Sequence, residues 1–209
     1  MKENYSNKCE QILNEIKEKK RLLLHSCCGP CSSYVITYLT NNFDITVLYY
    51  NPNIYPYEEY IKRKNEQIKI IELLNSKSKN NIDIMDCDYD NNLYEEKIKG
   101  LEMEPERGKR CEICYKLRIE KTANIAKENN YDYFCTTLSV SPYKNANLIN
   151  KIGEEMERKY KIKWLYSDFK KKDGYKKSIM LSQKYNLYRQ NYCGCIYSKK
   201  NIINSLQEQ

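Results

Sequence analysis

The chain of 209 residues has one histidine and one tryptophan, and it lacks any long run of apolar residues. With His25 as the only histidine, a metal site built mainly from imidazole ligands is excluded. A helix that spans a bilayer needs about 20 apolar residues, so no membrane association is expected. The opening sequence MKENYSNKCEQILNEIKEKK is polar and periodic like a helix, unlike a signal peptide. We therefore expect a cytoplasmic protein.

Glycine and proline are also scarce, at six and five residues, and no segment rich in glycine, serine or proline divides the chain. Such segments are the usual flexible linkers between domains. We therefore expect an N-terminal helix over residues 1–21. A single α/β catalytic domain over residues 22–209 is expected to end in a Cys-x-Cys segment.

Short β-branched and aromatic runs alternate with helix-periodic segments along most of the chain. This alternation is typical of a Rossmann-like parallel sheet with helices on both faces. The predicted strands are residues 22–25, 45–50, 82–85, 133–138 and 162–166. The predicted helices are residues 6–20, 31–40, 57–74, 111–128, 144–160 and 173–186. Ligands of such sheets bind beyond the carboxyl ends of the strands, where we expect the loop after residues 22–25.

What the chain does contain is ten cysteines, most of them in three groups. Clustered cysteines in a reducing cytosol more often bind metal or cycle between redox states than form permanent disulfides. The groups are Cys27, Cys28 and Cys31 in HSCCGPCSS, Cys111 and Cys114 in RCEICYKLR, and Cys193 and Cys195 in YCGC.

The first two groups supply the four thiolates that a 4Fe–4S cluster requires, from Cys27, Cys28, Cys111 and Cys114. Adjacent cysteines suit a multi-metal cluster better than a single zinc ion, whose ligands are usually spaced two to four residues apart. Cys111 and Cys114 share one face at a predicted helix start, where the helix dipole favours thiolates. We favour an iron–sulfur cluster, and a zinc staple on the same thiolates is the alternative.

Cys28 and Cys31 also form a Cys-x-x-Cys pair between a predicted strand and a predicted helix. This is the arrangement of a thioredoxin-like thiol–disulfide oxidoreductase. That interpretation leaves the other two cysteine groups without a purpose. The sequence leaves open whether Cys31 is a metal ligand, a spare thiol or a packed residue.

Cys193 and Cys195 flank Gly194, so a disulfide between them would close a small, strained ring. A strained disulfide is easily reduced, which favours a redox-active pair over a second metal clip.

Five further side chains lie outside these groups or stand alone in the sequence. Cys135 lies in an apolar predicted strand and is expected in the core, while Cys9 and Cys87 are given no role. His25 could donate a proton, but a packed histidine is favoured. Asp168 follows the last predicted strand, where it could ligate a metal, act as an acid or cap a turn.

The formal net charge is +8, and the excess is concentrated near the C-terminus. Residues 159–200 hold twelve lysines or arginines and only two acids. A one-sided stretch of this kind beside a cysteine site favours contacts to the phosphates of a nucleic acid. Arg189 and residues 170–172 are the candidate contacts.

These motifs resemble the epoxyqueuosine reductase family QueH from Leu22 to about Lys199. The resemblance is carried by the three cysteine motifs in this order and by four further segments. Those segments are Asn51-Pro52-Asn53-Ile54, TTLSVSPYK at 136–144, SDFKK at 167–171 and Tyr188-Arg189-Gln190 before YCGC.

The resemblance implies an architecture related to the adenine nucleotide α-hydrolases. It implies removal of the epoxide oxygen of epoxyqueuosine in the tRNA anticodon loop, without cobalamin and with an external electron donor. Cys27, Cys28, Cys111 and Cys114 would hold the 4Fe–4S cluster, and Cys193 and Cys195 would form the redox-active disulfide. One additional iron would lie next to the cluster, with Cys31 and Asp168 as candidate ligands.

One segment departs from the wider fold. Relatives that adenylate their substrates have a glycine-rich phosphate loop after the first strand, where this chain has residues 26–31. Proline and thiols there remove much of the anion-binding backbone, so ATP chemistry is not expected. We predict a two-electron deoxygenation assisted by a metal and a dithiol. A thioredoxin-like enzyme and a zinc-stapled RNA-binding module are the alternatives.

Overall fold

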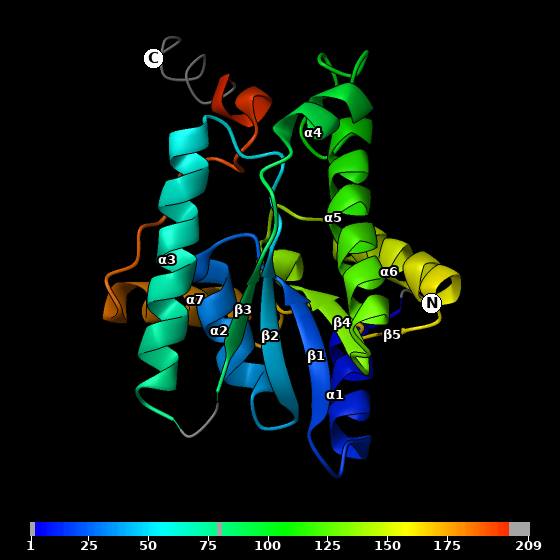
Figure 1. Cartoon of the computed structure of the whole chain (residues 1–209), viewed down its shortest axis with the longest axis vertical. Coiled ribbons are helices and arrows are strands. Elements are labelled where there is room, and N and C mark those ends of the chain that lie inside the picture. The colour runs from blue at the N-terminus through cyan, green and yellow to red at the C-terminus, as the bar shows by residue number, and fades with distance from the viewer. Residues whose placement is uncertain (1–2, 79–80, 201–209) are drawn as a thin grey trace.

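A five-stranded parallel sheet in the order β3-β2-β1-β4-β5 forms the centre of the protein (Figure 1). The structure is a computed structural model that describes residues 3–78 and 81–200. The strands are β1 (Lys20–His25), β2 (Phe43–Tyr49), β3 (Asp83–Asp86), β4 (Tyr133–Thr136) and β5 (Lys163–Trp164). The helices are α1 (Tyr5–Glu15), α2 (Gly29–Leu39), α3 (Tyr57–Asn75), α4 (Asn91–Lys97), α5 (Lys109–Glu128), η1 (Thr137–Val140), α6 (Ala146–Tyr160) and α7 (Gly174–Lys184).

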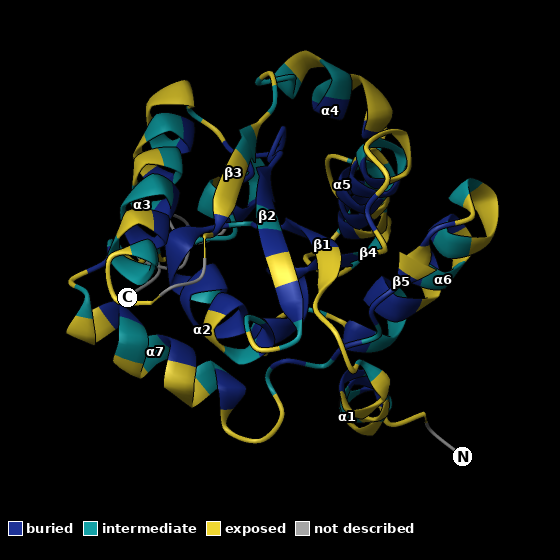
Figure 2. Cartoon of the chain, turned by 60° about the horizontal axis from the view of Figure 1, so that its bottom comes forward, coloured by how far each residue is buried: buried dark blue, intermediate teal, exposed yellow. Residues whose placement is uncertain are grey.

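Helices cover both faces of the sheet, as the alternating pattern predicts. Leu22 and Leu24 of β1 pack on one face with side chains from α1, α2, α3 and α7. Leu23 points to the opposite face, among side chains of α5 and α6. The inward faces of α2 and α5 are accordingly buried (Figure 2). The central strand is therefore apolar on both sides, which is typical of a covered parallel sheet.

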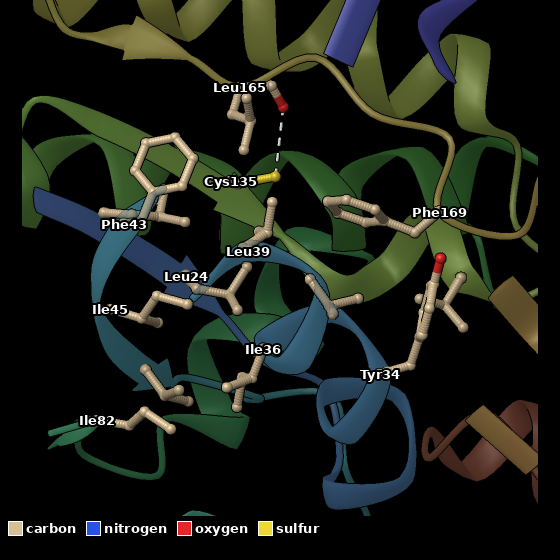
Figure 3. Close-up of a cluster of buried hydrophobic side chains, with 14 of the residues drawn as sticks. Leu24, Tyr34, Ile36, Leu39, Phe43, Ile45, Ile82, Cys135, Leu165 and Phe169 are labelled. Atoms are coloured by element: carbon tan, nitrogen blue, oxygen red, sulfur yellow. Dashed lines mark hydrogen bonds between the residues drawn. The ribbon is translucent and has the colours of Figure 1, made fainter. Parts of the chain in front are cut away.

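Cys135 of β4 lies within the first of these two cores (Figure 3). It is fully buried near Leu24 and Phe43, and its thiol donates a hydrogen bond to the Leu165 carbonyl at 3.3 Å. Burial raises the pKa of this thiol to about 12, so it stays protonated. The prediction that Cys135 is a core residue is confirmed.

Several element boundaries differ from the prediction. Helix α1 ends at Glu15 instead of residue 20, because the next residues turn extended to enter β1. Helix α2 begins at Gly29 instead of Cys31, since Pro30 fits the first helical turn. The edge strand β5 is only two residues long. Helix α4 was not predicted at all; Asp90 caps it by accepting a hydrogen bond from the Leu93 N–H at 3.4 Å.

No helix within residues 3–78 and 81–200 is both long and apolar enough to cross a bilayer.

Candidate active site

Cys27, Cys28 and Cys31 converge in the loop and first helical turn that follow β1. Their Sγ atoms all lie within 4.8 Å of one another, and those of Cys27 and Cys28 are 3.8 Å apart. The strand order reverses between β1 and β4, so this loop lies at the crevice where parallel sheets bind ligands. The Cys27 N–H donates to Thr137 Oγ1, just after β4, at 3.2 Å. That bond ties the two sides of the crevice together.

The three thiols differ in how readily they ionise. The Cys27 and Cys31 thiols both donate hydrogen bonds to Cys28, which holds the pKa of Cys28 well below its usual value. Hydrogen bonds to Cys27 and then to Cys28 raise the pKa of Cys31 well above the usual range, and the bond to Cys28 also raises that of Cys27. The group therefore offers one ready thiolate, and two more protons must leave before all three sulfurs can ligate a metal.

Cys111 and Cys114 lie in the first turns of α5, and both are buried. Cys111 Sγ accepts a hydrogen bond from the Arg107 N–H at 3.3 Å, and Cys27 packs against the side-chain cluster that contains Cys111. Cys114 packs instead with Cys195. Within the described residues, the mutual 4.8 Å spacing is limited to the first cysteine group, and Cys111 and Cys114 are not part of it.

Cys193 and Cys195 lie in the segment after α7, and both thiols are free. This segment (orange to red in Figure 1) reaches the end of the molecule where α4 and the start of α5 lie. Gly194 has φ of 130°, which favours glycine, and a Cβ there would approach Arg63 to 3.1 Å. The tight turn between the two cysteines therefore depends on Gly194.

Arg63 of α3 fixes this turn from below. It is almost fully buried and donates to the carbonyls of Tyr192 at 3.3 Å and Cys193 at 3.1 Å. Glu59 completes its hydrogen bonding through the Arg63 Nε at 2.7 Å. The Tyr55 N–H adds a bond to the Gly194 carbonyl at 2.8 Å. The backbone of the C-terminal cysteine pair is thus anchored to α3 and to the loop before it.

Cys27, Cys31 and Cys193 line one cavity of about 380 Å³. Three cations line it as well, among them Arg118 of α5 and Lys144 of the loop before α6. Lys144 Nζ donates to Cys193 Sγ at 2.8 Å. Burial alone raises the pKa of Cys193, but the charges of Lys144 and Arg118 outweigh it, so this pKa lies below its usual value. The cavity therefore combines sulfurs that could hold a metal ion with a thiol that ionises readily.

The sequence from residue 22 to residue 201 matches the family model described as epoxyqueuosine reductase QueH. The chain belongs to this family. It is 41% identical to the epoxyqueuosine reductase QueH of Streptococcus pyogenes serotype M1, over 94% of this chain and 78% of the relative. It is 33% identical to that of Thermotoga maritima, over 85% of this chain and 89% of the relative. The predicted QueH family and its oxidoreductase class are confirmed.

A solved structure shares the fold of this QueH member. It is the U34-tRNA thiolase NcsA from Methanococcus maripaludis with its [4Fe-4S] cluster, at a TM-score of 0.55 and 16% identity. The match covers 98% of this chain and 72% of the thiolase. The likeness at this identity concerns the fold alone, and with the strand order it confirms the predicted Rossmann-like parallel sheet with helices on both faces.

His25 is a packed histidine in this QueH chain, as the sequence favoured. Its ring is fully buried, with Nε2 at 3.0 Å from the Tyr50 carbonyl and Nδ1 at 2.7 Å from Thr136 Oγ1. Since a carbonyl can only accept, Nε2 holds the proton. Burial and the charge of Arg118 lower the pKa of His25 to about 3, so the ring stays neutral.

Asp168 does not line the cavity that holds the thiols. Lys170 Nζ donates to its carboxylate at 2.6 Å, and both side chains line a neighbouring cavity of about 440 Å³. Lys144 lines both cavities and so stands between them. The structure therefore brings Cys31 close to the other sulfurs but leaves Asp168 beside them, in a cationic surrounding.

Two site residues, Arg118 and Lys144, were missed by the sequence reasoning. Both lie inside motifs that were singled out, RCEICYKLR and TTLSVSPYK. Their presence in those motifs was the available signal. In a chain with 36 lysines and arginines, however, a single cation carries no mark of burial.

Proposed function

We propose that this chain removes the epoxide oxygen of epoxyqueuosine in tRNA and so forms queuosine. The balanced reaction takes two electrons and two protons, converts the epoxide to an alkene and releases water. The proposal is carried by one observation beyond family membership: Cys193, paired with Lys144, faces the same cavity as Cys27 and Cys31. A reducing thiol and a group of metal-binding sulfurs would then meet one substrate.

We further propose that Cys27, Cys28, Cys111 and Cys114 hold a 4Fe–4S cluster. The thiols present fit the ligands that such a cluster requires. Three of them lie close together at the ligand-binding edge of the sheet, and Cys27 packs against the group of buried side chains that contains Cys111. When bound, such a cluster supplies single electrons, and an adjacent iron supplies Lewis acidity. Cys31 is the better-placed candidate for that additional iron, since Asp168 is paired with Lys170.

In this proposal the two electrons come from Cys193 and Cys195, which close a disulfide as the epoxide is reduced. An external reductant, as yet unidentified, reopens the disulfide after each turnover. The thioredoxin-like alternative is less well supported, because Cys28 is only 1% exposed and cannot easily meet another protein's disulfide.

The tRNA would bind across the mouth of the cavity. Arg189 lines this cavity, Lys170 and Lys171 line its neighbour, and all three are suited to phosphate contacts. Tyr143 also lines the cavity and is 64% exposed, so it offers a ring on which an unpaired base can stack. A tRNA substrate fits the predicted cytoplasmic location.

Anaerobic purification followed by iron, sulfide and zinc analysis tests this proposal, together with an assay on tRNA that contains epoxyqueuosine. We expect bound iron and sulfide and conversion to queuosine. An iron-free protein that still converts the substrate would remove the cluster from the account. Bound zinc without turnover would identify an RNA-binding module, and a colourless protein that reduces general disulfides would identify a thioredoxin-like enzyme.

A further inference from the structure

We infer that the two thiols of the C-terminal pair have different tasks: Cys193 attacks an epoxide carbon, Arg118 receives the oxygen, and Cys195 releases the product. This inference rests on the proposed function, because it divides that reaction among side chains.

The two thiols differ in what they can reach. Cys193 lines the cavity, with its sulfur beside Lys144. Cys195 is not among the residues that line this cavity in the described part of the chain. It is buried among Tyr94, Ile98 and Cys114, and its sulfur accepts a hydrogen bond from the Ser198 N–H at 3.4 Å. A substrate in the cavity can therefore contact Cys193, whereas Cys195 is buried outside the cavity lining.

The charges around Cys193 favour a nucleophile. Lys144 contacts it from the loop before α6, Arg118 faces it from α5, and Glu106 faces it from the loop before α5. The thiols of Cys114 and Cys195 are also close enough to Cys193 to interact with its charge. Two cations against one carboxylate stabilise a thiolate, and the thiolate is the form that attacks carbon.

Arg118 has hydrogen-bonding capacity that no described residue uses. Its side chain is only 2% exposed, and its Nε donates to the Cys114 carbonyl at 3.1 Å. Its buried Nη2 has no partner among the described residues, although Arg118 lines the cavity. An unpaired buried donor is costly, so this nitrogen is suited to an acceptor that arrives with the substrate. A departing alkoxide is such an acceptor, and a preorganised cation lowers its energy.

The two thiols act in two successive steps. The Cys193 thiolate forms a C–S bond while one C–O bond of the epoxide breaks. Arg118 stabilises the resulting alkoxide, and Lys144 gives it a proton. Cys195 then loses its proton and attacks the Cys193 sulfur. As the S–S bond forms, the C–S electron pair becomes the second bond of the alkene, and hydroxide leaves with the Cys195 proton as water. The carbons gain the two electrons that the thiols lose, and an external dithiol later restores the pair.

The decisive variant is Cys195→Ser, studied as the anaerobically purified full chain with tRNA that contains epoxyqueuosine. The first step should proceed and the second should not, so we expect a covalent nucleoside adduct on Cys193. Mass spectrometry of nuclease- and protease-treated protein measures it. The matched Cys193→Ser variant should give no adduct. Absence of an adduct in Cys195→Ser, or an adduct on Cys195 in Cys193→Ser, would overturn the inference.

Turnover of the wild-type protein distinguishes a failure of this inference from a failure of the proposed function. If the wild-type protein forms queuosine but Cys195→Ser traps nothing, the division of tasks is wrong while the proposed function stands. If the wild-type protein forms no queuosine, both fail.

Arg118 has its own test in the rate of adduct formation. In the Cys195→Ser background, Arg118→Met should slow this step about 10²-fold, the usual effect of removing one oxyanion donor. Arg118→Lys should recover part of the rate, because it restores the charge. Lys116→Met on the same helix is the matched control, since Lys116 pairs with Glu155 at the surface. Far-UV circular dichroism verifies folding, and an unchanged rate in folded Arg118→Met would contradict the role.

Discussion

The core around Cys135 and the cavity around Cys193 shift the pKa of a cysteine thiol in opposite directions. Around Cys135 burial dominates and raises the thiol pKa to about 12. Around Cys193 burial also raises the pKa, but Lys144 and Arg118 reverse the direction. Between these two cysteines, the opposite direction of the thiol pKa shift therefore comes from the cations beside Cys193.

Polar groups divide between the two regions in the same way. In the core, Asn150 uses both ends of its amide: its Oδ1 accepts from Trp164 Nε1 and the Ser167 N–H, both at 3.0 Å. Its Nδ2 donates to the carbonyls of Ala146 and Ser167, both at 2.8 Å. At the cavity, the buried Arg118 Nη2 and Gln190 Oε1 have no partner in the described residues. Two of the six unpaired buried side-chain atoms in the described residues therefore belong to residues that line the cavity.

The largest expected effect is on turnover. Cys193→Ser should lower kcat at least about 10³-fold, because removing a nucleophile abolishes the step that depends on it. Cys135→Ala is the matched control: it should keep the wild-type kcat and lower the free energy of unfolding by about 1 kcal/mol. Conversion of epoxyqueuosine tRNA and chemical denaturation measure the two effects. Equal loss of turnover in both variants would show that Cys193 has no greater part in the reaction than the core residue Cys135.

The next effect is on stability, in the fully satisfied core. Asn150→Ala should lower the free energy of unfolding by about 3 kcal/mol, because Trp164 Nε1 and the Ser167 N–H lose their buried acceptor. Urea denaturation measures it, and the kcat of the folded fraction should not change. A destabilisation below about 1 kcal/mol would show that water replaces the amide and that the core is less dry than described.

A smaller effect is expected in the pH dependence of Cys193 alkylation. Lys144 helps to lower this pKa, so Lys144→Met should raise it. The thiolate forms above the pKa, and its reaction with iodoacetamide is lost as the pH falls through it. The rate profile should therefore move to higher pH. Lys116→Met is the control, and an unmoved profile in Lys144→Met would contradict the contact.

The smallest effect concerns the surface beside the cavity. Changing Lys171 to Ala should reduce the slope of log affinity against log salt by about one, the value for one lost phosphate contact. Lys116→Ala should leave the slope unchanged, because Lys116 pairs with Glu155 at the surface. Filter binding of tRNA over a salt series measures both. Identical slopes for the two variants would place the tRNA elsewhere.

Much of the fold follows from local sequence patterns. Leu22–Leu24 form an apolar run long enough for one buried strand, and the β-branched residues before Tyr49 mark the next. Helix α4 escaped because it is short and polar, and its main signal is the Asp90 cap. The two-residue length of β5 is set by its pairing with β4, which local propensity does not reveal.

The candidate site could be predicted only where its residues are close together in the sequence. Cys28 and Cys31 are close in sequence, so their meeting with Cys27 follows from the turn between strand and helix. The contact of Lys144 with Cys193 joins residues that are 49 positions apart in the sequence. The Nη2 atom of Arg118 lacks a hydrogen-bond partner because of how its side chain is packed in the fold. No sequence pattern separates those two cations from the many at the surface.

A single-turnover experiment tests the central claim most directly. The wild-type protein is fully reduced, freed of reductant without oxygen, and mixed with excess epoxyqueuosine tRNA. We expect one queuosine per chain and, by mass spectrometry, a disulfide between Cys193 and Cys195 formed in equal amount, with Cys135 still reduced. Queuosine formed while Cys193 and Cys195 both remain free thiols would contradict the account.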